Sequence, residues 1–138
     1  MIHSESMGSM GMTGFIGALS LLIIGGNDTT RNTMTAMAYA FDKFPDQRAK
    51  LEADPSLTGN AFSELVRWQT PLAHMRRTCI VDTDLEGQTI KVGDKVILWY
   101  ISANRDESVF PDADRLDITR DNARRHLAFG PCVSPRVS

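Results

Sequence analysis

Residues 21–34 read LLIIGGNDTTRNTM, and this stretch lies within a longer run that predicts one helix over residues 13–44. The first half of the run is almost entirely apolar, so we expect the helix to be mostly buried. Gly25-Gly26 permits a kink in the middle of the helix. Alternatively, the glycine pair forms a turn, and Asn27, Asp28 and Thr29 cap a second helix.

Two further helices are predicted downstream. Apolar residues continue at helical spacing toward Pro45, which ends the long helix or opens a short, solvated one over residues 45–53. A break at Asp54-Pro55 separates this helix from another over residues 60–69. We expect Phe62, Leu65 and Val66 to lie on its inner face.

After residue 70 the pattern changes from helical to extended. Short strands are predicted over residues 74–81, 89–92 and 96–100. Glu86-Gly87 and Gly93-Asp94 are the turn signals between them. From residue 104 onward the chain is rich in Asp, Arg and Pro, which predicts irregular structure. The expected fold class is therefore mainly α with a small antiparallel β-sheet.

Composition excludes several classes of protein. The chain has 138 residues, 42% hydrophobic and 23% charged, which fits one globular domain. A net charge of -2 gives no electrostatic case for nucleic acid. The apolar run 15–26 is too short to span a bilayer, and no basic residue precedes it as in a signal peptide. We expect no transmembrane segment and a cytoplasmic location, which two cysteines also suit. A secreted domain with a signal ending near Gly26 is the alternative.

Polar residues beside the glycine pair are the first candidates for chemistry. Asp28, Thr29 and Thr30 follow Gly25-Gly26 inside an apolar helix, where they can open a local pocket and relay protons. Glu64 and Arg67 are spaced as a helical acid–base pair, which is most often a solvated surface pair.

Basic residues and a cysteine form two more candidate groups. Arginine suits carboxylate binding, although an ordinary solvated surface is the more common explanation of such a basic set. This set comprises Arg76, Arg77, Arg124, Arg125 and His126. Cys132 follows the HLAFG segment and is a candidate thiolate ligand or a small buried hydrophobe.

The order and spacing of these motifs resemble the cytochromes P450. Residues 21–34 resemble the central helix of that family, with its Gly-x-(Asp/Glu)-Thr-Thr pattern, and SELVR at 63–67 resembles its Glu-x-x-Arg helix. Residues 76–121 are similar to the hairpin, short helix and meander that follow, and HLAFG at 126–130 to the start of the haem-ligand loop. The resemblance implies the C-terminal part of the cytochrome P450 fold, from the central long helix to the start of that loop. Residues 1–138 would then be an incomplete fragment of a single domain.

The resemblance also implies a role for individual residues. Asp28 and Thr29 would be the catalytic acid and alcohol that deliver protons. The oxygen and substrate groove would include Gly25, Gly26, Leu72 and His74. A structural salt-bridge triad would join Glu64, Arg67 and Arg115, although Leu116 stands where the family commonly has an aromatic residue. The cofactor-binding residues would be Arg77, His126 and Phe129, the first two at the haem propionates.

The haem-ligand loop departs from the family pattern, Phe-Gly-x-Gly-x-His/Arg-x-Cys. In register, Arg136 occupies the ligand position, and arginine cannot supply a thiolate. Cys132 is the nearest thiol but lies four residues early. The metal ligand therefore stays unassigned, and the end of the sequence is either an artefact or a real defect.

The function implied by the resemblance is monooxygenation with haem b (iron protoporphyrin IX) as cofactor. The finer likeness is to bacterial hydroxylases that oxidise the terminal carbon of alkanes or fatty acids. The implied partners are a ferredoxin, its NAD(P)H-dependent reductase and an apolar small-molecule substrate. The alternative is a haem-free, non-catalytic fragment or relic, and the 138 residues alone are expected to be inactive.

Overall fold

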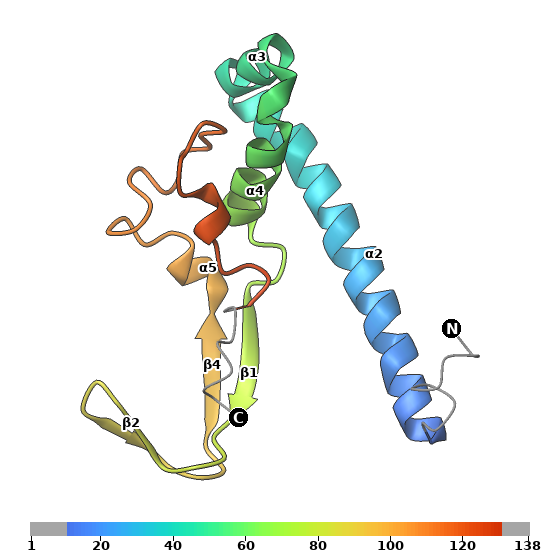
Figure 1. Ribbon diagram of the computed structural model, residues 1–138, viewed down its shortest axis with the longest axis vertical. Helices are drawn as coiled ribbons and strands as arrows, with labels where there is room; N and C mark the ends of the chain where they lie inside the picture. Colours follow the sequence, from blue (N-terminus) through green and yellow to red (C-terminus); the bar gives the residue numbers. More distant parts are fainter. Residues whose placement is uncertain (1–10, 131–138) are drawn as a thin grey trace.

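The computed structural model describes residues 11–130, which form helices and two small antiparallel sheets (Figure 1). In chain order the elements are α2 (Met12–Lys43), α3 (Pro45–Ala53), η1 (Pro55–Leu57), α4 (Thr58–Gln69), β1 (His74–Thr78), β2 (Thr83–Leu85), β3 (Gln88–Ile90), β4 (Lys95–Trp99), α5 (Tyr100–Ala103) and η2 (Ala123–Arg125). The predicted fold class, mainly α with a small antiparallel sheet, is confirmed. Among the described residues, no helix combines the length and apolar character needed to cross a membrane.

Helix α2 runs without interruption through Gly25 and Gly26. The alternative of a turn and a second, capped helix is therefore wrong. Pro45 occupies the first turn of α3, where its missing N–H costs no helical hydrogen bond. Figure 1 shows α2 leaving the corner formed with α3 and α4 and diverging from the strands.

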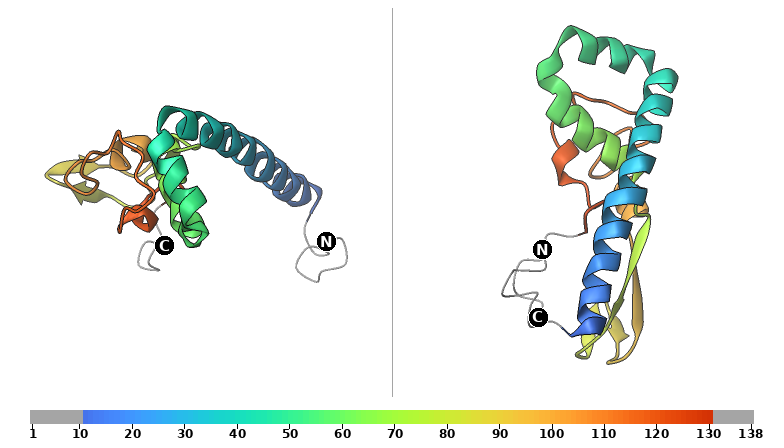
Figure 2. Two further views of the ribbon diagram at one scale, coloured as in Figure 1. Left: turned by 90° about the horizontal axis from the view of Figure 1, so that it is seen from above. Right: turned by 90° about the vertical axis from the view of Figure 1, so that its right-hand side faces the viewer.

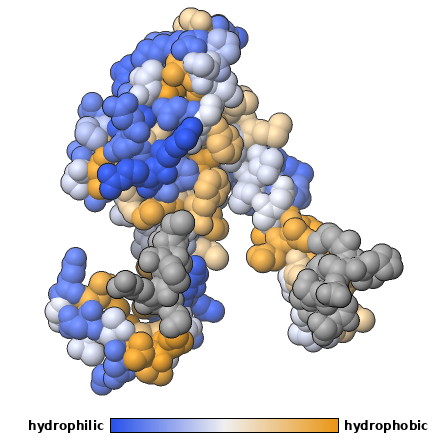
Figure 3. All heavy atoms as spheres, viewed as in Figure 1, coloured by the Kyte–Doolittle hydropathy of each residue, from blue (hydrophilic) through white to orange (hydrophobic). Residues whose placement is uncertain are grey.

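The expectation of a mostly buried α2 is wrong, because only Ala40 is buried along it. Ile24 is 66% exposed, and Ile16 and Leu22 are also exposed. Figure 3 shows hydrophobic atoms on the surface of the lower part of α2. Since α2 diverges from the strands and packs mainly on α3 and α4, no described element covers its apolar first half.

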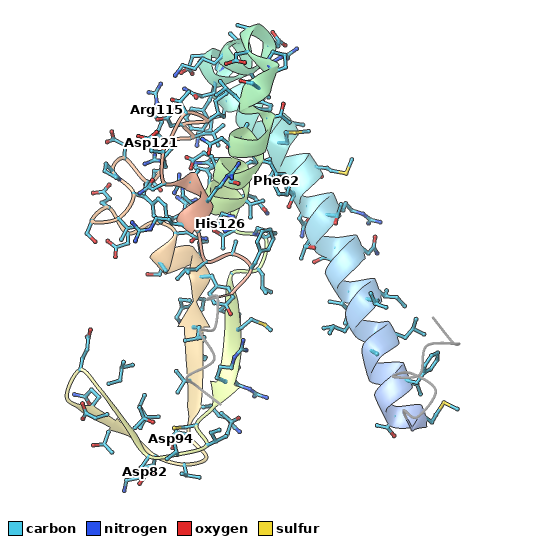
Figure 4. The ribbon with its side chains drawn as sticks, in the orientation of Figure 1. Phe62, Asp82, Asp94, Arg115, Asp121 and His126 are labelled. Atoms are coloured by element: carbon cyan, nitrogen blue, oxygen red, sulfur yellow. The ribbon has the colours of Figure 1, made fainter. Side chains whose placement is uncertain are left out.

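The core lies where α2, α4 and the irregular tail meet. It contains Ala40, Ala61, Leu65, Trp68, Leu116 and Ile118. Helix α4 begins two residues earlier than predicted, and Leu65 and Val66 are buried as expected. Phe62, however, is 53% exposed and points toward α2 rather than into this core (Figure 4).

The strands form two separate two-stranded sheets. Strand β1 pairs antiparallel with β4, with Arg77 opposite Val96. The hairpin β2–β3 turns at Glu86 and Gly87, both with positive φ, as predicted for this turn signal. Strand β2 was not predicted as a strand. Because side chains alternate along β1, Met75 and Arg77 face one side, and His74 and Arg76 face the other.

The tail from residue 104 packs along one side of α4, as the views in Figure 2 show. Asn60 donates to the carbonyls of Ile118 and Arg120 at 2.8 and 3.0 Å. The Trp68 indole donates to the Asp114 carbonyl at 2.8 Å. These side-chain donors satisfy the carbonyls of a segment that has little regular structure, and so fix its path.

Candidate active site

A hollow of about 510 Å³ lies between α2, β1 and the segment after η2; we call it the central hollow. It is lined by Gly25, Thr29, Pro71, Leu72, Met75, Arg77, Tyr100, Ala128, Phe129 and Gly130. Five of the predicted site residues therefore meet in one place although they come from distant parts of the sequence. These five are Gly25, Thr29, Leu72, Arg77 and Phe129.

A second hollow of about 310 Å³ adjoins the central hollow and shares Thr29, Pro71 and Phe129 with it. Its other walls are mostly apolar side chains of α2 and α4, including Met34, Met37, Phe62, Leu65 and Val66. The Phe129 side chain stands between the two hollows and is 75% exposed. Together the hollows form an open, largely apolar space between α2 and the part of the molecule that contains α4, β1 and residues 128–130.

The Thr29 hydroxyl donates to the Gly25 carbonyl one turn earlier, at 2.7 Å. A hydroxyl has two lone pairs besides its proton, so Thr29 keeps its acceptor capacity toward the hollow. A Cβ added at Gly25 would meet no atom within 4 Å, since the helix borders open space there. The glycine and the threonine thus give the hollow one flat, polar-edged wall.

Four of the residues predicted for the catalytic pair, the groove and the cofactor site line neither hollow: Gly26, Asp28, His74 and His126. The exposed Asp28 carboxylate accepts a hydrogen bond from Asn32 at 3.4 Å. The His74 ring packs on Trp99, with centroids 4.8 Å apart, on the face of β1 opposite Arg77. The strand alternation that brings Arg77 to the hollow therefore takes His74 away from it.

His126 packs its ring edge-on against Phe129, with centroids 5.1 Å apart. Its Nδ1 accepts a hydrogen bond from the Ala128 N–H at 3.3 Å, which requires the unprotonated nitrogen. Burial lowers the pKa of His126, and the nearby Arg67 charge lowers it further, against a smaller opposing effect of Glu64. The structure thus favours a neutral imidazole, whose ring packs against Phe129 without lining either hollow.

The Glu64–Arg67 pair is completely buried, so the solvated-surface interpretation of this pair is wrong. Arg67 donates to both Glu64 oxygens at 2.8 Å, and its remaining donors reach the carbonyls of Asn104, Ala113 and Arg115. A buried ion pair is tolerated when further hydrogen bonds satisfy its remaining groups, as they do here.

The third cation in this cluster is Arg120, whose Nε donates to Glu64 Oε1 at 3.2 Å. The prediction that Arg115 fills this place is wrong. The Arg115 guanidinium is 58% exposed and pairs with Asp46 at 3.0 Å (Figure 4 labels Arg115 on the outer side of the tail). Leu116 is fully buried in the core, and its neighbour Arg115 is turned outward. In the sequence, the departure at Leu116 from the aromatic residue common in the family was the sign that matching Arg115 to the third member of the triad was doubtful.

Sequence reasoning also missed Met75, Tyr100, Ala128 and Gly130 in the central hollow. Met75 was accessible from the sequence, because it shares a strand face with Arg77. Cys132 and Arg136, the two residues considered for the metal ligand, lie outside the described residues. Within residues 11–130 no cluster of His, Cys, Asp and Glu is arranged to hold a metal ion.

The family model "Cytochrome P450" matches residues 3–130 of this chain. The chain belongs to the cytochrome P450 family. The "Linalool 8-monooxygenase" of Pseudomonas putida is 48% identical, over 90% of this chain and 31% of that protein. The "Methyl-branched lipid omega-hydroxylase" of Mycobacterium tuberculosis is 46% identical, over 80% of this chain and 26% of that protein.

Solved cytochrome P450 structures agree with the fold. "CYP153D17" from Sphingomonas sp. PAMC 26605 is 69% identical and superposes with a TM-score of 0.88, covering 94% of this chain and 32% of that chain. The described elements therefore have the arrangement found in cytochromes P450. The chain spans about a third of the length of the relatives it matches.

Cytochrome P450 membership implies haem, and the residues of the central hollow fit this group. Haem is a flat apolar disc with a carboxylate-bearing edge. The hollow offers Leu72, Met75 and Phe129 as apolar walls and the Arg77 guanidinium as a carboxylate partner. The absent Cβ of Gly25 leaves space for a flat group against α2.

Proposed function

We propose that the protein to which this chain belongs is a haem-dependent monooxygenase that inserts one oxygen atom of O2 into a C–H bond. The observation that carries the proposal is the central hollow, because Gly25 and Thr29 of α2 line it together with Arg77 and Phe129. We assign haem b as the cofactor. When bound, it would supply the dioxygen chemistry.

The residues of this chain would bind and orient the cofactor and manage protons. Arg77 would pair with a propionate, and Leu72, Met75 and Phe129 would pack on the disc. The Thr29 hydroxyl, oriented by the Gly25 carbonyl at 2.7 Å, would pass a proton at its oxygen atom. Asp28 lies outside the hollow and would supply that proton from the solvent-exposed side of α2. His126 would act on the cofactor only through Phe129, its ring neighbour.

The substrate proposed is an alkane or fatty acid hydroxylated at its terminal carbon. Two observations support this choice: the apolar lining of both hollows, and the omega-hydroxylase among the relatives, which acts at a chain end of a methyl-branched lipid. Electrons would come from a ferredoxin and its NAD(P)H-dependent reductase, in the cytoplasm. No residue is proposed as the axial ligand.

The test uses a full-length chimera in which residues 12–130 of this chain replace the matching segment of the Sphingomonas protein. At 69% identity most of the aligned residues are the same in the two proteins, and the host supplies the rest of the enzyme. Reduced, CO-treated chimera should show the long-wavelength Soret band of a haem-thiolate protein. With ferredoxin, reductase and dodecane, it should form the terminal alcohol. A chimera that folds but takes up no haem would favour the haem-free alternative and contradict the proposal.

A further inference from the structure

Asn104 is completely buried and is hydrogen-bonded to Thr70 and Leu127, the residues that directly precede two segments lining the central hollow. It follows α5, and its side chain is used in two directions. Its Nδ2 donates to Thr70 Oγ1 at 3.0 Å, and its Oδ1 accepts from the Leu127 N–H at 2.8 Å. One amide group therefore joins two segments that are far apart in the sequence.

The Thr70 end of this link holds one wall of the central hollow, the one formed by Pro71 and Leu72 after α4. Thr70 is buried with φ of 47°, a left-handed conformation that is strained for a β-branched residue. Its hydroxyl donates to the Arg67 carbonyl at 2.7 Å, which leaves a lone pair to accept from Asn104. Pro71 and Leu72, the next residues, line the central hollow, so the angle of this turn sets where they stand.

The Leu127 end of the link holds a second wall of the central hollow, the one formed by residues 128–130. Leu127 is followed directly by Ala128, Phe129 and Gly130, all of which line the central hollow. The Leu127 carbonyl also accepts from the Gly130 N–H at 2.8 Å, so holding Leu127 holds the whole turn. A change in the Leu127 position would therefore move Phe129 and Gly130 together.

We propose that Asn104 is a positioning residue that keeps the two walls of the central hollow in register. Its backbone carbonyl accepts from Arg67 Nη1 at 2.7 Å, which anchors it to the buried ion pair. Hydrogen bonds made by a buried amide are rigid, because each lost partner leaves a desolvated polar group. The consequence for haem retention rests on the proposed function, whereas the link between the walls does not.

Three variants divide the link into its parts. Asn104→Ala removes both contacts. Asn104→Asp keeps an acceptor for the Leu127 N–H but, as a carboxylate, has no N–H to donate to Thr70. Thr70→Val has nearly the same shape and the same backbone strain. It removes the acceptor for Asn104 together with the donor to the Arg67 carbonyl, and leaves the Leu127 end intact.

Asn60→Ala is the matched control. Asn60 also ties α4 to the tail by donating to two carbonyls, at 2.8 and 3.0 Å, but its partners Ile118 and Arg120 line neither hollow. Loss of this link should lower the global stability of the chimera without moving the walls.

The experiment measures hydrogen exchange of the peptide containing Leu127, and the rate of haem transfer from the chimera to apomyoglobin. In Asn104→Ala, exchange at Leu127 should be about tenfold to a hundredfold faster, the range for loss of one buried hydrogen bond. Haem transfer should also speed up. Asn104→Asp should restore Leu127 protection, and Thr70→Val should leave Leu127 protected while haem leaves faster.

Two outcomes would overturn the inference. If Asn60→Ala raises Leu127 exchange and haem transfer as much as Asn104→Ala does at equal loss of stability, Asn104 acts only through global stability. Alternatively, unchanged Leu127 exchange in Asn104→Ala would show that the link does not hold the wall. The exchange measurement needs no haem, so it decides the inference even if the unmutated chimera binds none and the proposed function fails.

Discussion

Glu64 and Arg120 are joined across the core, with Arg120 Nε 3.2 Å from Glu64 Oε1 and only 9% of the Arg120 side chain exposed. The Glu64 carboxylate thus receives Arg67 from its own helix and Arg120 from the tail. This contact ties the tail to α4 at Arg120, and so helps to hold in place the following segment, which carries Phe129.

Arg120 and Arg115 should differ sharply when each is replaced. Arg120→Ala leaves the buried Glu64 with less compensating charge, and should lower the free energy of unfolding by about 3 kcal/mol or more. Arg115→Ala removes an exposed pair and should cost about 0–1 kcal/mol. Urea unfolding of the full-length chimera measures both. Equal losses would mean that the exposed Arg115–Asp46 pair carries as much of the fold as the buried one.

Replacing Thr29 should uncouple electron use from product formation. Thr29→Ala removes the hydroxyl that the Gly25 carbonyl orients. Without it, no oriented group of α2 would deliver protons at this point of the hollow, and reduced oxygen should be released as peroxide. We expect more hydrogen peroxide and less alcohol per NAD(P)H oxidised, by up to roughly a hundredfold, the lower end of the range for a lost proton-transfer group. Thr33→Ala is the control, because its hydroxyl bonds the Thr29 carbonyl at 2.8 Å and it lines only the second hollow. An unchanged ratio in Thr29→Ala would remove Thr29 from proton delivery.

Alanine at Gly25 should separate helix stability from ligand binding. Nothing blocks a Cβ there, so Gly25→Ala should stabilise α2 by about 0.5–1 kcal/mol through helix propensity. The same methyl group would occupy the space against α2 in the central hollow and weaken haem uptake. Gly17→Ala gains the same helical term and lies outside both hollows. Denaturant unfolding of the apo chimera and haem titration test the pair, and equal haem affinity in both variants would contradict the assignment.

His126 should make stability depend on pH. Because burial lowers its pKa below the usual 6.5, the unfolded chain binds a proton that the folded chain resists. Stability should therefore fall as the pH drops below about 6.5, and be unaffected by this group well above that value. His126→Gln should flatten that part of the profile, measured by urea unfolding between pH 5 and about pH 8. A profile equally steep in the variant would assign the effect to other groups.

Much of the fold and part of the site could be predicted from the sequence, because these features depend on local patterns. The bounds of α3, the turn at Glu86-Gly87, the burial of Leu65 and the pairing of Glu64 with Arg67 follow from helical spacing, turn chemistry and motif order. The set Gly25, Thr29, Leu72, Arg77 and Phe129 was likewise predicted from the family resemblance, and these residues meet in one hollow.

The sequence by itself determined which segments are helical, which are extended and which family the motifs resemble, since these depend on residue type and spacing along the chain. Only the tertiary structure decided that Arg120 rather than Arg115 meets Glu64, and that Asn104 joins the segments at Thr70 and Leu127. Neighbouring arginines in an irregular tail look equivalent in sequence. Their side chains are distinguished only when Leu116 enters the core and turns Arg115 toward solvent.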